Sequence, residues 1–421
     1  MFRKILAAFL VWIFLFNIGF TYSADSLSLK ALVEEAQKNN PEILAARKRW
    51  EASKARIPQA KSLDDPVFGL TFEKTPGSPF QLQKTASEDR MLSIAQFFPF
   101  FGKLPLKGKI ALVESQMFAL QYKDKELEII NRVKNGYFDL FMNYKEIELA
   151  RQSLLLLENI ARASEARYSL GDMSQEEIYK IDAEIARLNN TIRNLEQERL
   201  SKQTRLNTLL NKDPEENLGI PELNEDVSFD SDSRSLYQAT LLNQPELLTF
   251  SYAIEKNKYA RDLAKKSFFP DLMAGIVQRG ITTGTIGPWD LMLSFTLPLW
   301  FWTKQRYQVK EAIANLEEAE AAYKVMENRA FREVKDLAVK IEVAKNKIRL
   351  YKTSLIPILE SSINSSLSAY ASGKGDFMML LDSQRMLVEA RMDYYRALVE
   401  YNMNLADLER SVGINLSGVK K

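Results

Sequence analysis

The residue types that carry most enzyme chemistry are scarce in this chain of 421 residues. It has no cysteine and no histidine, so it lacks the usual nucleophile–base pairs and the usual ligands of zinc. Carboxylate chemistry stays open, and the 13 methionines could contact copper(I). Methionine at helical spacing is more often a core residue, however. We therefore expect no enzyme, no cofactor and no resident metal site.

The N-terminal residues have the order of a secretory signal peptide. Arg3 and Lys4 precede an apolar run that ends at Phe20, and small or polar residues follow to Ala24. We expect residues 1–24 to be removed on export; the alternative is an uncleaved membrane anchor, because the run is near the lower length limit for a spanning helix. The formal charge of +2 lies in this segment. A neutral mature chain predicts no nucleic-acid partner.

The remaining chain contains an internal repeat of about 200 residues. Asn40-Pro41-Glu42 recurs as Gln244-Pro245-Glu246, an offset of 204, and the Tyr-x-x-Gly segment at Tyr168 recurs at Tyr370, an offset of 202. An acidic segment with three Pro or Gly residues separates the copies, and we interpret it as a solvated linker rather than a binding segment. The expected domains are a first repeat (25–211), an acidic linker (212–234), a second repeat (235–413) and a C-terminal tail (414–421).

Each repeat is expected to contain a helix, two short strands and a long helical hairpin. Alternating apolar and polar residues predict β-hairpins over 67–98 and 271–297. Apolar residues spaced by three and four predict coiled-coil hairpins over 104–211 and 305–412. The fold class is therefore mainly α with a small β part, internally duplicated. Prolines suit the helix–strand junctions because they cannot donate in a helix interior or a central ladder. They stand at all four: Pro66, Pro99, Pro270 and Pro298.

The strands carry apolar side chains on one face, which we expect to contact lipid. Strands of about eight residues can nearly cross an outer membrane when they are tilted. Four strands cannot close a barrel, and lipid leaves no sheet edge unpaired, so several protomers would share one barrel; three would give twelve strands. The alternative is the core face of a soluble hairpin. The proposed lipid-facing residues are Phe68, Leu70, Phe72, Leu291, Leu293 and Phe295.

Three tryptophans, Trp289, Trp300 and Trp302, flank the fourth predicted strand. Aromatic residues at strand ends suit the interface between membrane and water. Packing at the base of the barrel is an equal alternative.

The doubled pattern resembles the TolC-like outer-membrane efflux protein family over essentially the whole mature chain. Each motif is weak alone, but their order, found twice, is specific. The matching segments are Asn39-Asn40-Pro41-Glu42, Asn243-Gln244-Pro245-Glu246, Gln96-Phe97-Phe98-Pro99 with Gly102-Lys103, Leu297-Pro298-Leu299-Trp300 with Lys304-Gln305-Arg306, Ala166-Arg167-Tyr168-Ser169-Leu170-Gly171 and Ala369-Tyr370-Ala371-Ser372-Gly373.

The resemblance implies a homotrimer whose 12-stranded β-barrel lies in the bacterial outer membrane and whose α-helical barrel extends into the periplasm. Its implied partners are outer-membrane lipid, a periplasmic adaptor (membrane fusion) protein and an inner-membrane pump such as a resistance-nodulation-division transporter. The implied function is passive conduction in a tripartite efflux system, and the chain is most similar to the heavy-metal or cation branch. The alternatives are the outer-membrane component of a type I protein secretion system and, from a different class, a periplasmic coiled-coil adaptor or scaffold.

The resemblance also assigns roles to residues at the ends of the helical hairpins. It implies a periplasmic gate at Asp382, with Asp376 as a second candidate whose alternative role is to cap the following helix. Met379 stands where the family has another acid. The turn residues could instead form a plain helix–turn–helix. The residues that it assigns to adaptor contact are Arg167, Tyr168, Leu170, Gly171, Ser174, Tyr370, Gly373 and Lys374.

Overall fold

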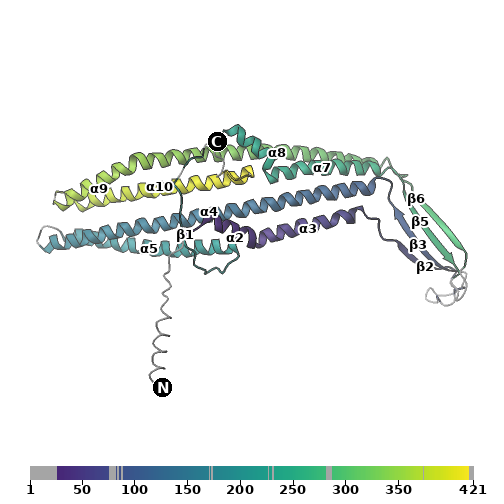
Figure 1. Ribbon diagram of the computed structural model, residues 1–421, viewed down its shortest axis with the longest axis horizontal. Helices are drawn as coiled ribbons and strands as arrows, with labels where there is room; N and C mark the ends of the chain where they lie inside the picture. The colour runs from purple at the N-terminus through teal and green to yellow at the C-terminus, as the bar shows by residue number, and fades with distance from the viewer. Residues whose placement is uncertain are drawn as a thin grey trace, which may run out of the picture. The chain divides into compact units, whose positions relative to one another are not determined.

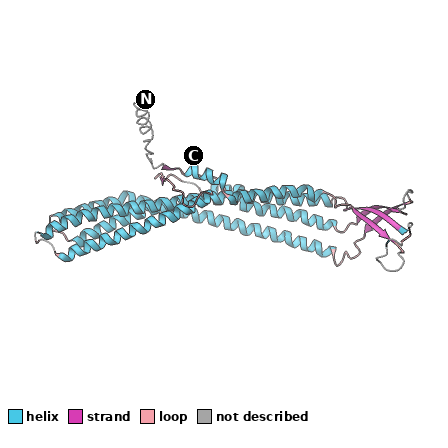
Figure 2. Cartoon of the chain, turned by 90° about the horizontal axis from the view of Figure 1, so that it is seen from below, coloured by secondary structure: helices cyan, strands magenta, loops and turns pink. Residues whose placement is uncertain are grey.

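The computed structural model describes residues 26–74, 82, 85–86, 89–169, 171, 174–225, 227–229, 232–280, 287–372 and 374–416. The proposed signal peptide, Leu170 and Gly373 lie outside the described residues. Helices make up most of the described chain, as predicted, and apart from one short pair the strands form a single sheet (Figure 2). Two compact units can be distinguished. Each unit draws on both sequence repeats.

The first compact unit comprises the described parts of 1–38, 132–228 and 342–403. Its helices form two hairpins, one from each repeat. α4 (Lys103–Ser169) is followed by α5 (Gln175–Leu210), and α9 (Ile356–Ala371) is followed by α10 (Phe377–Val412), as the labels in Figure 1 show. Near the hairpin ends the four helices share one buried cluster. It consists of Leu157, Ile160, Ile181, Tyr370, Phe377, Leu380 and Leu381.

The first repeat forms an uninterrupted α4 of 67 residues, which begins the helical hairpin predicted from the apolar spacing. The second repeat differs. α8 (Gln305–Leu350) passes into a π-helical turn, Tyr351–Leu355, before α9 begins. Pro357 lies in the first turn of α9. Because proline has no N–H to donate to the preceding turn, a wider turn at this point accommodates it. This interruption was not predicted from the sequence.

The described acidic side chains of the connector after α5 are exposed, as expected of a solvated linker, but its backbone is attached to the first unit. Its strand β4 (Ile220–Pro221) pairs in parallel with β1 (Ser26–Leu27). The buried Tyr137 side chain places its hydroxyl 2.9 Å from the Leu27 carbonyl and 2.6 Å from the Glu222 carbonyl. The Asn207 amide donates to the Pro214 and Glu216 carbonyls, at 3.3 and 2.7 Å. These bonds satisfy backbone groups that a mobile linker would leave to water.

The second compact unit comprises the described parts of 39–131, 229–341 and 404–421. Besides the adjoining ends of α4, α8 and α10, it contains short helices that precede each strand pair. In the first repeat these are the end of α2 (Leu29–Asn39) and α3 (Pro41–Lys61), and in the second they are α6 (Ser233–Asn243) and α7 (Pro245–Lys266). The Asn40 side chain caps α3 by accepting from the N–H groups of Glu42 and Ile43. Its counterpart Gln244 makes no such bond.

The four long strands of this unit form one antiparallel sheet in the order β2-β3-β5-β6. The strands are β2 (Val67–Phe72), β3 (Arg90–Phe98), β5 (Asp271–Arg279) and β6 (Trp289–Thr296), each within a residue or two of its predicted position. The two hairpins join through β3 and β5, with Met91 opposite Arg279. β2 and β6 are the edge strands of the described sheet (Figure 1).

Among the helices of the described residues, none is both long and apolar enough to cross a membrane.

Candidate functional site

The turns at the ends of the two helical hairpins contain most of the residues predicted to contact a partner. Gly171 adopts φ +81°, which suits glycine, and its N–H donates to the Tyr168 carbonyl at 3.0 Å. Ser174 caps α5 by accepting from the Glu177 N–H. In the other hairpin, the N–H groups of Lys374 and Gly375 donate to one carbonyl. The described residues of both turns are therefore held by hydrogen bonds.

The predicted contact residues differ in accessibility. Tyr168, Gly171, Ser174 and Lys374 are exposed, and Arg167 is half-buried. Tyr370 is 4% exposed and belongs to the core of the first unit. In this chain, then, the Tyr370 ring is not on the surface where a partner could meet it.

Tyr370 instead connects the two hairpins. Its hydroxyl lies 2.6 Å from the Ser164 hydroxyl of α4, and Arg167 donates to its carbonyl at 3.2 Å. The Arg167 guanidinium also lies 5.3 Å from the centre of the Tyr370 ring. Phe377, fully buried at the start of α10, packs edge-on against the same ring. Ser164 was not singled out from the sequence, because its partner lies 206 residues further along the chain.

Both predicted gate carboxylates are exposed. Asp376 directly precedes α10, and its carbonyl accepts from the Leu380 N–H at 3.4 Å. Its charge acts on Lys180 of α5: the pKa of Lys180 is raised first by the hydrogen bond to Glu176 and further by the charges of Glu176 and Asp376. Asp382 lies on the following turns of α10, beyond the exposed Met379. Asp376 therefore has a nearby counter-charge.

A second set of polar contacts connects the hairpins further from the turns. Arg385 of α10 lies 2.9 Å from Glu184 of α5, which also pairs with Arg187 at 3.0 Å. The Gln384 amide donates to the Ser153 carbonyl of α4 at 3.4 Å. These residues were missed in the sequence. Opposite charges on corresponding turns of the two hairpins are the signal that could have indicated the Glu184–Arg385 pair.

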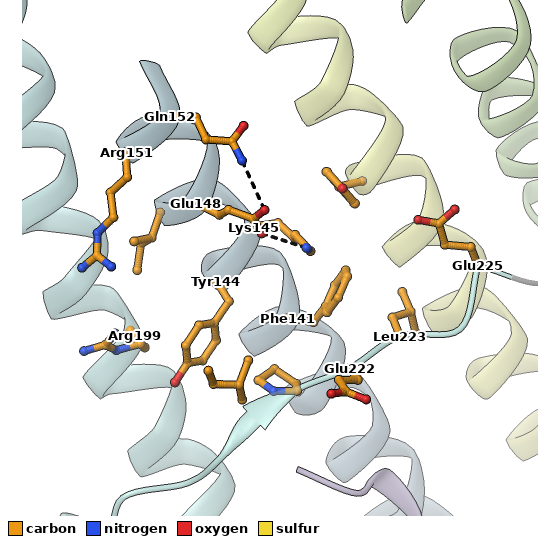
Figure 3. Close-up of a pocket in the computed structure, with 14 residues that line it drawn as sticks. Phe141, Tyr144, Lys145, Glu148, Arg151, Gln152, Arg199, Glu222, Leu223 and Glu225 are labelled. Atoms are coloured by element: carbon orange, nitrogen blue, oxygen red, sulfur yellow. Dashed lines mark hydrogen bonds and ion pairs between the residues drawn. The ribbon is translucent and has the colours of Figure 1, made fainter. Parts of the chain in front are cut away.

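The largest described cavity of the first unit, about 850 Å³, lies between α4, α5, α10 and the connector. Figure 3 shows it lined by aromatic rings, including Phe141 and Tyr144, and by charged side chains of both signs. Burial is the largest single effect on Lys145 and opposes its charged form. The hydrogen bond to Glu148, at 2.8 Å, and the charges of Tyr395, Glu148 and Glu225 together exceed it, so the pKa of Lys145 is raised. With its charges compensated inside the cavity, the site favours neither an anion nor a cation.

The connector is attached beside this cavity through Glu225. The Glu225 carboxylate accepts from Lys352 Nζ at 2.7 Å and from the Tyr394 hydroxyl at 2.8 Å. These two hydrogen bonds lower the pKa of Glu225. Burial, together with the Glu225 charge, raises the pKa of Tyr394 to about 12. Lys352 lies in the π-helical turn, so the connector binds at the point where the second repeat departs from the first.

In the second unit, the residues proposed to face lipid are exposed. They lie on the edge strands β2 and β6, and their exposed fractions are Phe68 64%, Leu70 61%, Phe72 36%, Leu291 72%, Leu293 57% and Phe295 60%. Side chains of this kind are normally buried, and a contiguous exposed set indicates a surface that meets another apolar phase.

The four prolines lie between helices and strands, at Pro66, Pro99, Pro270 and Pro298. Asp271 connects the segment after Pro99 to the segment after Pro270. Its Oδ1 accepts from the Phe100 N–H at 2.5 Å and from Lys103 Nζ at 2.7 Å. The Phe100 and Phe269 rings stack above this contact, with their centres 4.4 Å apart. The junction therefore has fixed geometry.

Within the described residues, no three or more Asp or Glu side chains are grouped so that they could hold a metal ion.

The chain matches the family model described as "Outer membrane efflux protein" over residues 32–212 and 236–414. It is similar to the cobalt-zinc-cadmium resistance protein CzcC of Cupriavidus metallidurans, with 19% identity over 392 residues that cover 93% of this chain and 91% of the relative. It is 23% identical over 386 residues to the toluene efflux pump outer membrane protein TtgF of Pseudomonas putida. The match covers 87% of this chain and 79% of the relative. The crystal structure of the outer membrane protein VceC from Vibrio cholerae has a TM-score of 0.76 at 17% identity, covering 92% and 97%.

Proposed function

This chain belongs to the outer membrane efflux protein family, and we propose that three copies of it form one exit duct through the outer membrane. The duct conducts substrate passively. It receives that substrate from a periplasmic adaptor protein and an inner-membrane pump, such as a resistance-nodulation-division transporter.

One observation carries the trimer: the four-stranded sheet ends in two edge strands, β2 and β6, whose side chains are apolar and exposed. In lipid, an unpaired edge leaves backbone N–H and C=O groups without partners, at a cost of several kcal/mol each. Pairing β6 of one copy with β2 of the next removes both edges. Three copies give twelve strands, enough to enclose a channel.

The periplasmic gate is proposed to be formed by Asp382, with Asp376 in a secondary role. Three copies would place a ring of carboxylates around one aperture, where like charges focus negative potential and attract cations. Asp376 contributes less, because the Lys180 charge acts on it. We propose that the adaptor contacts the exposed turn residues Tyr168, Gly171, Ser174 and Lys374. The half-buried Arg167 stabilises these turns through its contacts with Tyr370.

Metal cations are the proposed cargo. The support is the name of the relative CzcC, a cobalt-zinc-cadmium resistance protein that matches 93% of this chain. A second candidate, organic solvents, is supported by the name of the toluene efflux relative TtgF. The duct itself needs no metal ligands for either cargo, since selection can take place in the pump. The alternatives of a type I secretion component or a periplasmic adaptor have less support, because the relatives named above are a metal-resistance and an efflux protein and the sheet is apolar on its surface.

The decisive experiment combines a physical and a cellular measurement. Purified protein should have the mass of a trimer in detergent and form channels in planar bilayers. A strain lacking the gene should become sensitive to cobalt, zinc or cadmium and keep its tolerance of toluene. A monomer without conductance would contradict the duct, whereas sensitivity to toluene alone would contradict only the metal cargo.

A further inference from the structure

The end of the sheet that leads into α8 carries a pocket that conduction does not explain. It has a volume of about 360 Å³ and lies between the end of β6, the turn over 297–304 and the first turns of α4 and α8. Pockets that hold small ligands begin at about this size. The side chains that matter here are Lys103, Asp271, Thr296, Trp300, Lys304 and Gln305.

Gln305 is the first sign that the pocket holds a ligand. The residue is only 8% exposed, it lines the pocket, and its side-chain oxygen Oε1 has no hydrogen-bond partner among the described residues. A buried amide oxygen normally accepts a hydrogen bond, because its loss of water is otherwise uncompensated. A ligand with an N–H or O–H group would supply the missing donor.

The charge of the pocket indicates the other part of that ligand. Asp271 is the only carboxylate in the lining, and it is already paired with Lys103 at 2.7 Å. Lys304 is exposed and forms no ion pair within the described part of the chain. It directly precedes the 46-residue helix α8, whose N-terminus favours a negative group. One uncompensated cation beside a helix N-terminus suits a single phosphate.

The surroundings indicate where the phosphate comes from. Three large apolar side chains that line the pocket are more than half exposed: Leu297 65%, Leu299 64% and Trp300 67%. The next two residues along the chain, Phe301 and Trp302, are each 50% exposed. The Trp302 ring packs edge-on against both Trp300 and Phe301. Tryptophan and lysine together at the end of a lipid-crossing strand are typical of the level of phospholipid headgroups.

We propose that this pocket binds the headgroup of an outer-membrane phospholipid, with the phosphate at Lys304 and the α8 N-terminus and a terminal N–H or O–H donor at Gln305 Oε1. The acyl chains would lie against Trp300 and its apolar neighbours. The inference rests on the proposed function, because it needs the sheet to lie in the membrane. Headgroups such as phosphoethanolamine and phosphoglycerol have the donor, and phosphocholine does not.

The test measures lipid retention by the full-length trimer. The protein is reconstituted into mixed bilayers of phosphatidylcholine with a minor share of phosphatidylethanolamine or phosphatidylglycerol, and the lipids that stay bound after extraction are identified by native mass spectrometry. Donor-bearing lipids should be enriched about three- to tenfold over their share, which is the range that one or two hydrogen bonds provide. Lys304→Gln and Gln305→Met should each remove that enrichment, while Lys310→Gln, an exposed lysine on the same helix, should keep it.

Two outcomes would overturn the inference: retention in proportion to the bulk lipid, or equal loss in all three variants. Inorganic phosphate and soluble glycerophosphoethanolamine should not displace the bound lipid; displacement by either would mean that the site takes a free anion. Because Gln305 is buried, the Gln305→Met variant is first tested for the trimer mass. If it fails to assemble, lipid retention by the exposed Lys304→Gln variant alone tests the inference. Conductance is recorded on the same samples. If the unmodified protein conducts normally but shows no lipid selectivity, only the proposed lipid site is contradicted. If the unmodified protein does not conduct, the proposed duct is contradicted.

Discussion

Lys103 Nζ lies 2.7 Å from Asp271 Oδ1, so the first residue of α4 is joined to the first residue of β5 across 168 positions of the chain. Both side chains are largely buried, at 13% and 20% exposure. The same carboxylate oxygen accepts from the Phe100 N–H. One aspartate therefore joins the place where β3 leads into α4 to the place where α7 leads into β5.

Replacing Asp271 by asparagine should weaken this junction. The change leaves the Lys103 charge largely buried without its partner, which costs more than losing an exposed pair. We expect a loss of about 2–3 kcal/mol of unfolding free energy, measured as a lower melting temperature of the purified protein. The control is Asp290→Asn, because its pair with Arg279 is half exposed on both sides and should contribute less than about 1 kcal/mol. Equal effects of the two changes would contradict the special role of Asp271.

Replacing Tyr370 by phenylalanine should loosen the ends of the helical hairpins. The substitution keeps the buried ring but leaves the Ser164 hydroxyl, 1% exposed, without its partner. A cost of about 1–2 kcal/mol follows. Amide hydrogen exchange should increase in α9 and in the end of α4. The matched control is Tyr168→Phe at the exposed position of the other hairpin, and a similar increase there would contradict the prediction.

Replacing Asp382 by asparagine should raise the resting conductance or lower the preference for cations. A ring of three carboxylates would lose its negative potential, and the effect should be largest at low salt because screening is then weakest. Asp376→Asn should have a smaller effect, because Lys180 already acts on that carboxylate. Asp182→Asn, an exposed acid on α5, is the control. Unchanged conductance and selectivity in Asp382→Asn would remove it from the gate.

Lowering the pH should release the connector from Lys352. The pKa of Glu225 is lowered in the folded protein, so the stability that it contributes is present above the ordinary glutamate pKa of about 4.3. It is lost as the pH falls through the lowered value, when protonation removes the attraction to Lys352. Tyr394 stays neutral throughout this range because its pKa is about 12. The protection of residues 217–225 against hydrogen exchange, taken relative to the intrinsic rate at each pH, should therefore decrease at acid pH.

The control for the acid response is Glu225→Gln. This variant should show the increased exchange at neutral pH and no further change specific to the connector on acidification. If the connector of the unmodified protein has the same protection factors at neutral and acid pH, the ion pair does not hold it.

The sequence alone determined the four long strands and the long helices of this protein, but not the π-helical turn or the short strands β1 and β4. The strand positions follow from alternation between neighbouring residues, and the long helices follow from apolar residues three and four apart; both patterns are local. The internal repeat is likewise visible in the sequence. The prolines predicted the ends of helices and strands, because proline restricts its own backbone and has no N–H to donate.

Only the tertiary structure decided which side chains meet. Tyr370 was predicted at the surface and is buried, because its partner Ser164 comes from a helix 206 residues away. The acids of the connector are exposed, as predicted for a solvated linker, but the sequence did not show that Lys352, 127 residues further along, binds Glu225. The charge and polarity of a side chain indicate whether it favours contact with water. They do not indicate which groups, distant in the sequence, form hydrogen bonds or ion pairs with that side chain once the helices pack.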